Sequence, residues 1–160
     1  MPTPCNLRVP EYPGGSEKEG RADTSDIFEI EHHLHQPVEP TTGQASGVRV
    51  HSPFRVVKLI DKATPGFHKA LCTGQNLAEV TIDFYHISPE SREEEKYYVV
   101  ILRQARIVDI RPYMPMSFVP ANESYRHMEQ VSFVYEEIEW KMEGGGPAEM
   151  DKWRAPGGAA

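Results

Sequence analysis

HMEQVSFVYEEIEW, residues 127–140, is the stretch that decides the fold class. Its apolar side chains occupy alternating positions, first odd and then even: Val131, Phe133, Tyr135, Ile138 and Trp140. Alternation with period two is typical of a β-strand that buries one face. The change of phase near residues 136–137 predicts either a β-bulge or a strand that leaves the core and meets a partner with its other face.

Further strand patterns lie on both sides of this stretch. Apolar alternation or short apolar runs occur at residues 27–34, 54–60, 80–85, 97–102 and 107–110. Residues 64–73 instead predict a short α-helix, with Thr64 as the N-cap, Pro65 as the first helical residue and Gly74 as the stop. We therefore expect an all-β fold, a β-barrel or sandwich of two antiparallel sheets, with one short α-helix.

The chain divides into three segments by composition. Residues 1–26 are rich in proline, glycine and charge, which predicts an irregular N-terminal segment that adds little to the core. Residues 27–143 contain the strand patterns and form the expected barrel domain. Residues 144–160, GGGPAEMDKWRAPGGAA, have the composition of a disordered Gly/Pro/Ala-rich tail.

The charge balance and the lack of long apolar runs exclude several classes of partner. The chain has 160 residues and a net charge of -7, so nucleic acid and anionic membrane surfaces would repel it. No apolar run approaches the ~18 residues of a membrane helix, and prolines interrupt the N-terminus where a signal peptide needs an apolar run. Cys5 and Cys72 are too few for a disulfide framework, which favours reduced thiols in a protein made in the cytoplasm.

His33, His35 and Glu39 are the candidates for a metal site. A strand would place both histidines on one face, and the carboxylate follows at a spacing that cupin-type metal sites use. Pro37 would break such a strand, and no second motif supplies a further histidine. The preferred interpretation is a polar strand face with exposed histidines, so we expect no metal, no cofactor and no enzymatic activity.

The segment GQASGVRVHSPF, residues 43–54, predicts a shaped connector that enters a strand. Gly43 and Gly47 allow the backbone positive φ, and Pro53 drives its neighbours into extended conformation. A connector of this kind suits docking onto another surface. Arg49, and Arg106 further along the chain, could each pair with an acid across a subunit contact or remain an ordinary exposed arginine.

With these strings, the chain resembles the hemolysin-coregulated proteins, Hcp, of bacterial type VI secretion systems. The resemblance extends from about residue 27 to residue 143, and RVHSPF, HMEQVSF and IEW are its most specific parts. The matching positions are Pro37, Pro40, Gly43, Gln44, Gly47, Arg49, Val50, His51, Pro53, Phe54, Asp61, Lys62, Ala63, Pro65, Ala70, Leu71, Gly74, Tyr113, Met114, Pro115, the run 127–133, Tyr135, Ile138 and Trp140.

The resemblance implies a structural, secreted protein. Hcp proteins are small β-barrels with one helix that form hexameric rings, and the rings stack into the inner tube of the secretion machine. Expected partners are further copies of the chain, the spike protein at the tube tip, the sheath, and small effectors carried in the lumen. The protein would reside in the bacterial cytoplasm before firing and then outside the cell or in a target cell, by a route that needs no signal peptide.

We expect the subunit or ring-stacking interface at residues of the connector: Pro40, Gly43, Gln44, Gly47, Arg49 and His51. Residues 6–26 depart from the family, because proline, glycine and charge replace its opening strand. A missing strand would leave a sheet edge open. Two alternatives therefore stay open: a monomeric adaptor that binds effectors without polymerising, and a metal-dependent cupin-like enzyme.

Overall fold

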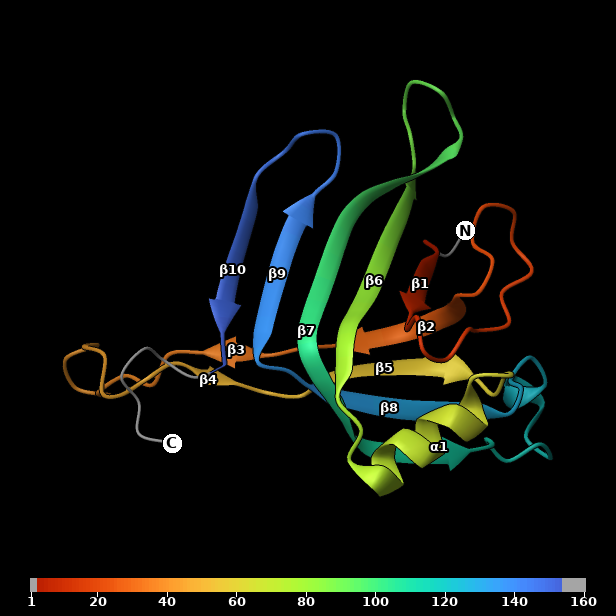
Figure 1. Cartoon of the computed structure of the whole chain (residues 1–160), viewed down its shortest axis with the longest axis horizontal. Coiled ribbons are helices and arrows are strands. Elements are labelled where there is room, and N and C mark those ends of the chain that lie inside the picture. Colours follow the sequence, from red (N-terminus) through yellow and green to blue (C-terminus); the bar gives the residue numbers. More distant parts are fainter. Residues whose placement is uncertain (1–2, 154–160) are drawn as a thin grey trace.

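The computed structural model describes residues 3–153 and consists of β-strands with one α-helix (Figure 1). In chain order its elements are β1 (Cys5–Arg8), β2 (Ser25–Glu31), β3 (Leu34–His35), β4 (Val50–His51), β5 (Phe54–Leu59), α1 (Thr64–Thr73), β6 (Leu77–Ile87), β7 (Glu94–Tyr113), a 3-10 turn (Pro120–Asn122), β8 (Met128–Val134), β9 (Glu137–Met142) and β10 (Ala148–Lys152).

Six of the strands close into a barrel. The strand order is β7-β6-β1-β2-β5-β8, and β8 pairs back onto β7, so the sheet has no gap. β9 and β10 extend beside the first half of β7, and every pairing in this sheet is antiparallel. The prediction of an all-β barrel with one helix is confirmed.

β7 is long enough to pair with both β8 and β9. β9 pairs with its first half, Tyr98 to Arg103, and β8 pairs with its second half, Arg106 to Tyr113. Between the two halves the backbone bends at Gln104, whose φ is +52°. The phase change near residues 136–137 coincides with the break between β8, which ends at Val134, and β9, which begins at Glu137, so two successive strands stand where the sequence suggested a bulge or a change of partner within one strand.

The N-terminal segment is more regular than its composition predicts. β1 lies between β2 and β6, and Cys5, Leu7 and Val9 are buried in the core. The expectation that residues 1–26 are irregular and add little to the core is therefore wrong for this strand. Proline disrupts only the strand positions it occupies, and Pro4 and Pro10 lie outside β1. β1 covers the neighbouring edge of β2 as far as Ile27, and the rest of that edge has no partner in residues 3–153.

The C-terminal segment also forms a strand. β10 pairs along its whole length with β9, and Gly144 and Gly145 adopt φ of +76° and +79° in the connecting turn. These glycines supply a hairpin turn rather than disorder, because glycine adopts positive φ without steric cost. The prediction of a disordered tail is thus wrong for residues 148–152, and residues 154–160 lie outside the described part of the chain.

The helix forms where the sequence predicts it, with a different start. Gly74, at φ +64°, ends α1 as expected. Thr64 is already helical and Ala63 is the N-cap residue, so the predicted cap is wrong. The Thr64 hydroxyl instead donates to Glu129 Oε1 over 2.8 Å, because a buried carboxylate on the neighbouring strand needs a donor there. Phe67 and Ala70 pack into the barrel core.

Candidate assembly surfaces

The described residues do not assemble a metal centre. No group of three or more His, Cys, Asp or Glu side chains in residues 3–153 is placed to hold a metal ion. His33 and His35 stack with ring centroids 5.0 Å apart, while Glu39 accepts a hydrogen bond from the Thr41 hydroxyl. The structure therefore does not bring the three predicted candidates together as a site.

In the same part of the chain, no helix is long and apolar enough to cross a membrane.

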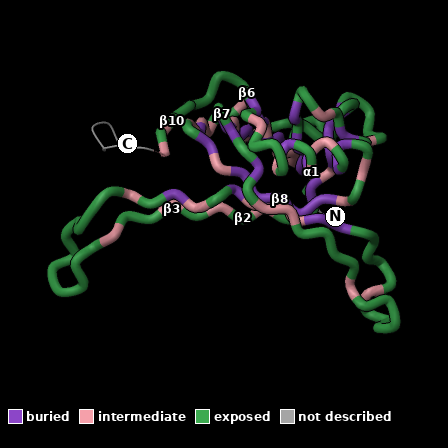
Figure 2. Tube along the Cα trace, turned by 60° about the horizontal axis from the view of Figure 1, so that its bottom comes forward, coloured by how far each residue is buried: buried purple, intermediate pink, exposed green. Residues whose placement is uncertain are grey.

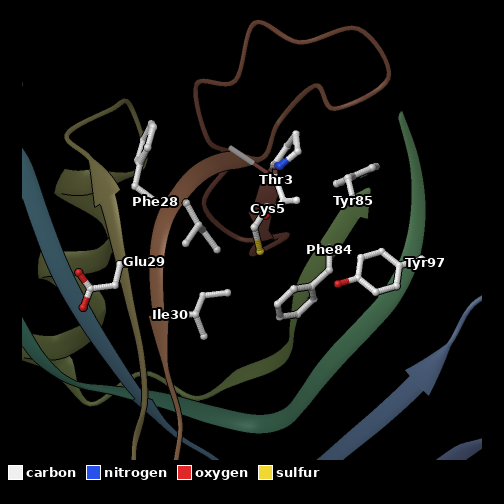
Figure 3. Close-up of a pocket in the computed structure, with 10 residues that line it drawn as sticks. Thr3, Cys5, Phe28, Glu29, Ile30, Phe84, Tyr85 and Tyr97 are labelled. Atoms are coloured by element: carbon white, nitrogen blue, oxygen red, sulfur yellow. The ribbon is translucent and has the colours of Figure 1, made fainter. Parts of the chain in front are cut away.

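A small pocket of about 180 Å³ lies between β1, β2, β6 and β7 (Figure 3). Its lining includes Phe28, Ile30, Phe84 and Tyr97, and the Cys5 side chain points between Ile30 and Phe84 (Figure 3). Burial, and secondarily the charge of Asp83, raises the pKa of the Cys5 thiol to about 12. The thiol stays protonated at neutral pH and is a poor nucleophile. The pocket is therefore not arranged for covalent catalysis.

The most exposed feature of the molecule is a hairpin that we call the arm, residues 32–53. It projects beyond the barrel at one end and is green over most of its length in Figure 2, the colour of exposed residues. Only the two-residue strands β3 and β4 and a bridge between Val38 and Ala45 pair its two sides. Of the interface residues expected from the sequence, four lie on its exposed outer part: Pro40, Gly43, Gln44 and Gly47. The other two, Arg49 and His51, lie at its base.

A chain of hydrogen bonds crosses the base of the arm. His51 Nε2 lies 2.9 Å from Asp151 Oδ2, and His51 Nδ1 lies 2.8 Å from the Tyr135 hydroxyl. The same hydroxyl lies 2.8 Å from His32 Nε2. Because an ionised carboxylate only accepts, His51 Nε2 carries the proton in this arrangement. Arg49 and, to a lesser degree, His51 lower the pKa of Asp151 to about 2, so this carboxylate is charged at neutral pH.

Burial is the main reason that the pKa of His32 falls to about 4, and the nearby His51 and His33 lower it further. The folded protein then keeps His32 neutral where the unfolded chain, with an ordinary pKa near 6.5, binds a proton. We expect the free energy of unfolding to decrease as the pH falls from about 6.5 towards 4, and to decrease less steeply in His32→Gln. Urea unfolding at several pH values measures both slopes, with the exposed His35→Gln as the control. Identical slopes in all three proteins would contradict this role for His32.

Four strands form one wall of the barrel, which we call the four-stranded wall: β2, β5, β8 and the second half of β7. Each is antiparallel to its neighbour. Within residues 3–153, β2 beyond Ile27 pairs only with β5, and residues 106–113 of β7 pair only with β8. The wall therefore ends on both sides in an open strand edge. Pro112 has no backbone N–H, which leaves residues 106–111 as the part of the β7 edge that can pair fully.

The two open edges have opposite net charge. Glu29 and Glu31 are exposed on the β2 edge, and Arg106 and Arg111 are exposed on the β7 edge, where the half-buried Asp109 lies between them. Arg55, on the adjacent β5, forms ion pairs with both glutamates. An acidic edge and a basic edge on the same wall are complementary between two copies of the chain placed side by side.

The arm and a long apolar loop leave the four-stranded wall at opposite ends. Phe54 of β5 pairs with Phe133 next to the arm, whereas Leu59 pairs with Met128, which also pairs with Tyr113. The loop of residues 114–127 follows Tyr113, so it lies at the end away from the arm (Figure 1). Phe118 in this loop is 94% exposed, and Met116 is 67% exposed.

A closed barrel with two complementary strand edges, a projecting arm and an exposed apolar loop is the architecture of a structural protein that associates with its own copies. Comparison with known proteins agrees with this class. Residues 7–142 match the family described as "Type VI secretion system effector, Hcp". The chain therefore belongs to the Hcp family and is a component of the type VI secretion system.

Individual relatives support the assignment. The "Major exported protein" of Pseudomonas aeruginosa PAO1 is 37% identical over 143 residues, which are 89% of this chain and 83% of that protein. The solved Hcp1 protein of E. coli EAEC 042 is 28% identical, with a TM-score of 0.81 over 96% of this chain and 99% of that one. The secreted protein Hcp3 of Pseudomonas aeruginosa is also 28% identical, with a TM-score of 0.73 over 96% of this chain and 100% of that one.

Sequence reasoning missed the surfaces that depend on β10 and on the strand edges. Arg49 was expected to pair across a subunit contact or to stay free, but it pairs with Asp151 of the same chain. The only local signal for β10 was the polar, apolar, polar alternation of Glu149, Met150 and Asp151. The glycines before it made this segment resemble a disordered tail. No local sequence pattern predicts the open edges, because a strand edge is open only when no distant strand pairs with it.

Proposed function

We propose that this protein forms a homohexameric ring in which the β2 edge of one copy pairs with the β7 edge of the next. The number of strands in the four-stranded wall is even and their directions alternate, so a neighbour in the same orientation continues the antiparallel order. Such a contact uses two different surfaces of each copy, which is the head-to-tail kind that closes into a ring. The copy number of six follows the Hcp family. The observation on which this proposal rests is the pair of open, oppositely charged edges.

The rings stack into a tube in this proposal. When copies stand side by side in one orientation, every arm leaves the same face of the ring and every loop of residues 114–127 leaves the opposite face. Stacking then brings the arms of one ring towards the loops of the next. Both surfaces expose apolar side chains: Val38 and Val48 of the arm are 52% and 59% exposed, and Phe118 of the loop is 94% exposed.

The remaining roles follow from membership of the family. The tube protein would be present in the bacterial cytoplasm before firing and would then leave the cell or enter a target cell. Its partners would be the tip spike protein, the sheath and small effectors in the lumen, and it would perform no catalysis. The alternative of a monomeric adaptor was based on an N-terminal strand missing from this chain. Because the N-terminal segment contains β1, which lies at the centre of the sheet, this alternative loses its support.

Light scattering after size exclusion, with negative-stain images of the same peak, tests the ring. We expect a mass of about six chains of 18.1 kDa and ring-shaped particles. Deletion of residues 43–47 should leave single rings that no longer stack, since it removes the outer part of the arm and leaves the strand edges intact. A monomer of the unaltered chain at all concentrations would refute the ring, and normal tubes from the deletion variant would refute stacking through the arm.

A further inference from the structure

The arm has no core that could fix its direction. None of residues 33–50 is buried, and β3 and β4 contribute two residues each. A two-stranded hairpin without a packed face is marginally stable in water. The direction in which the arm leaves the barrel must therefore be determined by contacts at its base.

The C-terminal strand supplies most of these contacts. The Arg49 guanidinium donates two hydrogen bonds of 2.5 Å, one to each carboxylate oxygen of Asp151, and a third of 3.2 Å to the Lys152 carbonyl. A two-point contact between arginine and a carboxylate fixes the relative orientation of the two groups as well as their distance. Asp151 lies on β10, whose pairing with β9 ties it to the barrel wall.

His51 adds a second link to the same carboxylate. Its side chain is fully buried, donates from Nε2 to Asp151 Oδ2, and stacks on Trp153 with ring centroids 5.5 Å apart. The backbone N–H of Trp153 donates to the Glu136 carbonyl over 2.9 Å, which anchors the end of β10 at the break between β8 and β9. The strand that holds the arm is therefore itself held at that break.

No other part of the described chain makes comparable contacts with the arm. Every side-chain hydrogen bond from the arm, residues 32–53, to the rest of residues 3–153 ends on Tyr135, Asp151 or Lys152. We infer that Asp151 is a positioning residue: it fixes the direction of the arm by holding Arg49 and His51 with one carboxylate. The importance of this direction for stacking rests on the function proposed above, whereas the positioning itself does not.

A distance between the arm and the barrel measures this role directly. Ser46→Cys places a spin label on the exposed outer part of the arm, and the exposed native Cys72 in α1 takes the second label, while Cys5 is buried. Labelled chains are diluted with unlabelled chains, so that only distances within one chain contribute to double electron–electron resonance. In the otherwise unaltered protein we expect a single narrow distance distribution.

Asp151→Ala should broaden this distribution and shift its maximum, because Arg49 and His51 then lose the carboxylate that they share, and only the bond from Arg49 to the Lys152 carbonyl and the stacking of His51 on Trp153 remain. Arg49→Ala should broaden it less, since His51 still reaches Asp151. The variant with both substitutions should be only slightly broader than Asp151→Ala, because Arg49 adds no contact beyond Asp151 except its bond to the Lys152 carbonyl. Glu149→Ala, on the same strand but without a side-chain hydrogen bond to the arm, is the matched control and should leave the distribution unchanged. Urea unfolding of each variant shows whether the barrel remains intact.

A narrow, unshifted distribution in Asp151→Ala would overturn the inference, whatever the oligomeric state. A distribution that broadens equally in Glu149→Ala would also overturn it. Any change in β10, and not specifically the loss of the Asp151 carboxylate, would then disturb the arm. A broadened distribution in Asp151→Ala, together with normal tubes on electron micrographs, would support the positioning role and refute stacking through the arm.

Discussion

Lys58→Met is expected to lower the free energy of unfolding by about 3–5 kcal/mol. Lys58 and Glu129 are fully buried side chains on the paired strands β5 and β8, and they form an ion pair in the barrel. The Lys58 ammonium also donates to Asp61 Oδ1 over 3.0 Å and to the Leu59 carbonyl over 3.1 Å. Removal of this cation leaves the buried carboxylate of Glu129 without a compensating charge, which is the costly half of breaking a buried ion pair.

The double variant Lys58→Met/Glu129→Leu separates this cause from simple loss of packing. Replacing both charges by apolar groups of similar size is often nearly neutral, so the double variant should be much more stable than Lys58→Met. Chemical denaturation of the two single variants and the double variant completes the cycle. Additive losses in the double variant would mean that the two side chains act independently. The surface variant Arg55→Met, whose ion pairs are exposed, should cost less than about 1 kcal/mol.

Asp61 links this ion pair to the N-terminal segment. Burial opposes its ionisation, yet the Lys58 charge and the hydrogen bond from the Ser25 hydroxyl keep the pKa of Asp61 below its ordinary value. Its carboxylate also accepts from the Gly15 backbone over 3.2 Å. The loop that returns from β1 is thereby attached to the start of α1, although its own sequence suggests no structure.

Reversal of the charges on the β7 edge should abolish ring formation. Arg106→Glu/Arg111→Glu places acidic side chains opposite Glu29 and Glu31 of the neighbouring copy, and like charges across an interface cost several kcal/mol (of order 2–5) per contact. Because every contact in a ring is the same, each one is weakened. Light scattering should show a shift from about six chains to one. The monomer should remain folded, because both arginines are exposed.

A compensating variant makes this prediction specific. Adding Glu29→Lys and Glu31→Lys to the two arginine substitutions restores opposite charges across the contact and should restore the rings. Lys18→Glu/Lys69→Glu makes the same change in net charge at exposed residues away from both edges and should assemble normally. Rings in the Arg106→Glu/Arg111→Glu variant would place the subunit contact elsewhere on the surface. Dissociation of the Lys18→Glu/Lys69→Glu control would show that net charge, and not edge complementarity, governs assembly.

The fold class, the strands with clear alternation, the helix and its glycine stop can all be predicted from the amino-acid sequence. These features are local, because a side-chain period of two or a helix stop is encoded within about ten residues. Composition misled where a short element lies among turn residues. Prolines on both sides of β1 and glycines before β10 gave the appearance of irregular segments, yet both strands are completed by hydrogen bonds to partners whose position the local sequence does not specify.

Which distant residues meet depends on the tertiary structure alone. Arg49 reaches Asp151, 102 positions away, at the base of the arm, and Lys58 reaches Glu129 because β5 and β8 pair in a register that places the two residues opposite each other. The two open edges of the four-stranded wall exist because β1 and β6 pair with only part of β2 and β7. Neither these side-chain contacts nor the open edges produce a periodic pattern in the sequence. Both depend on how closure of the barrel aligns strands that are far apart in the chain. The arm was visible in the sequence as a connector, but its direction comes from β10.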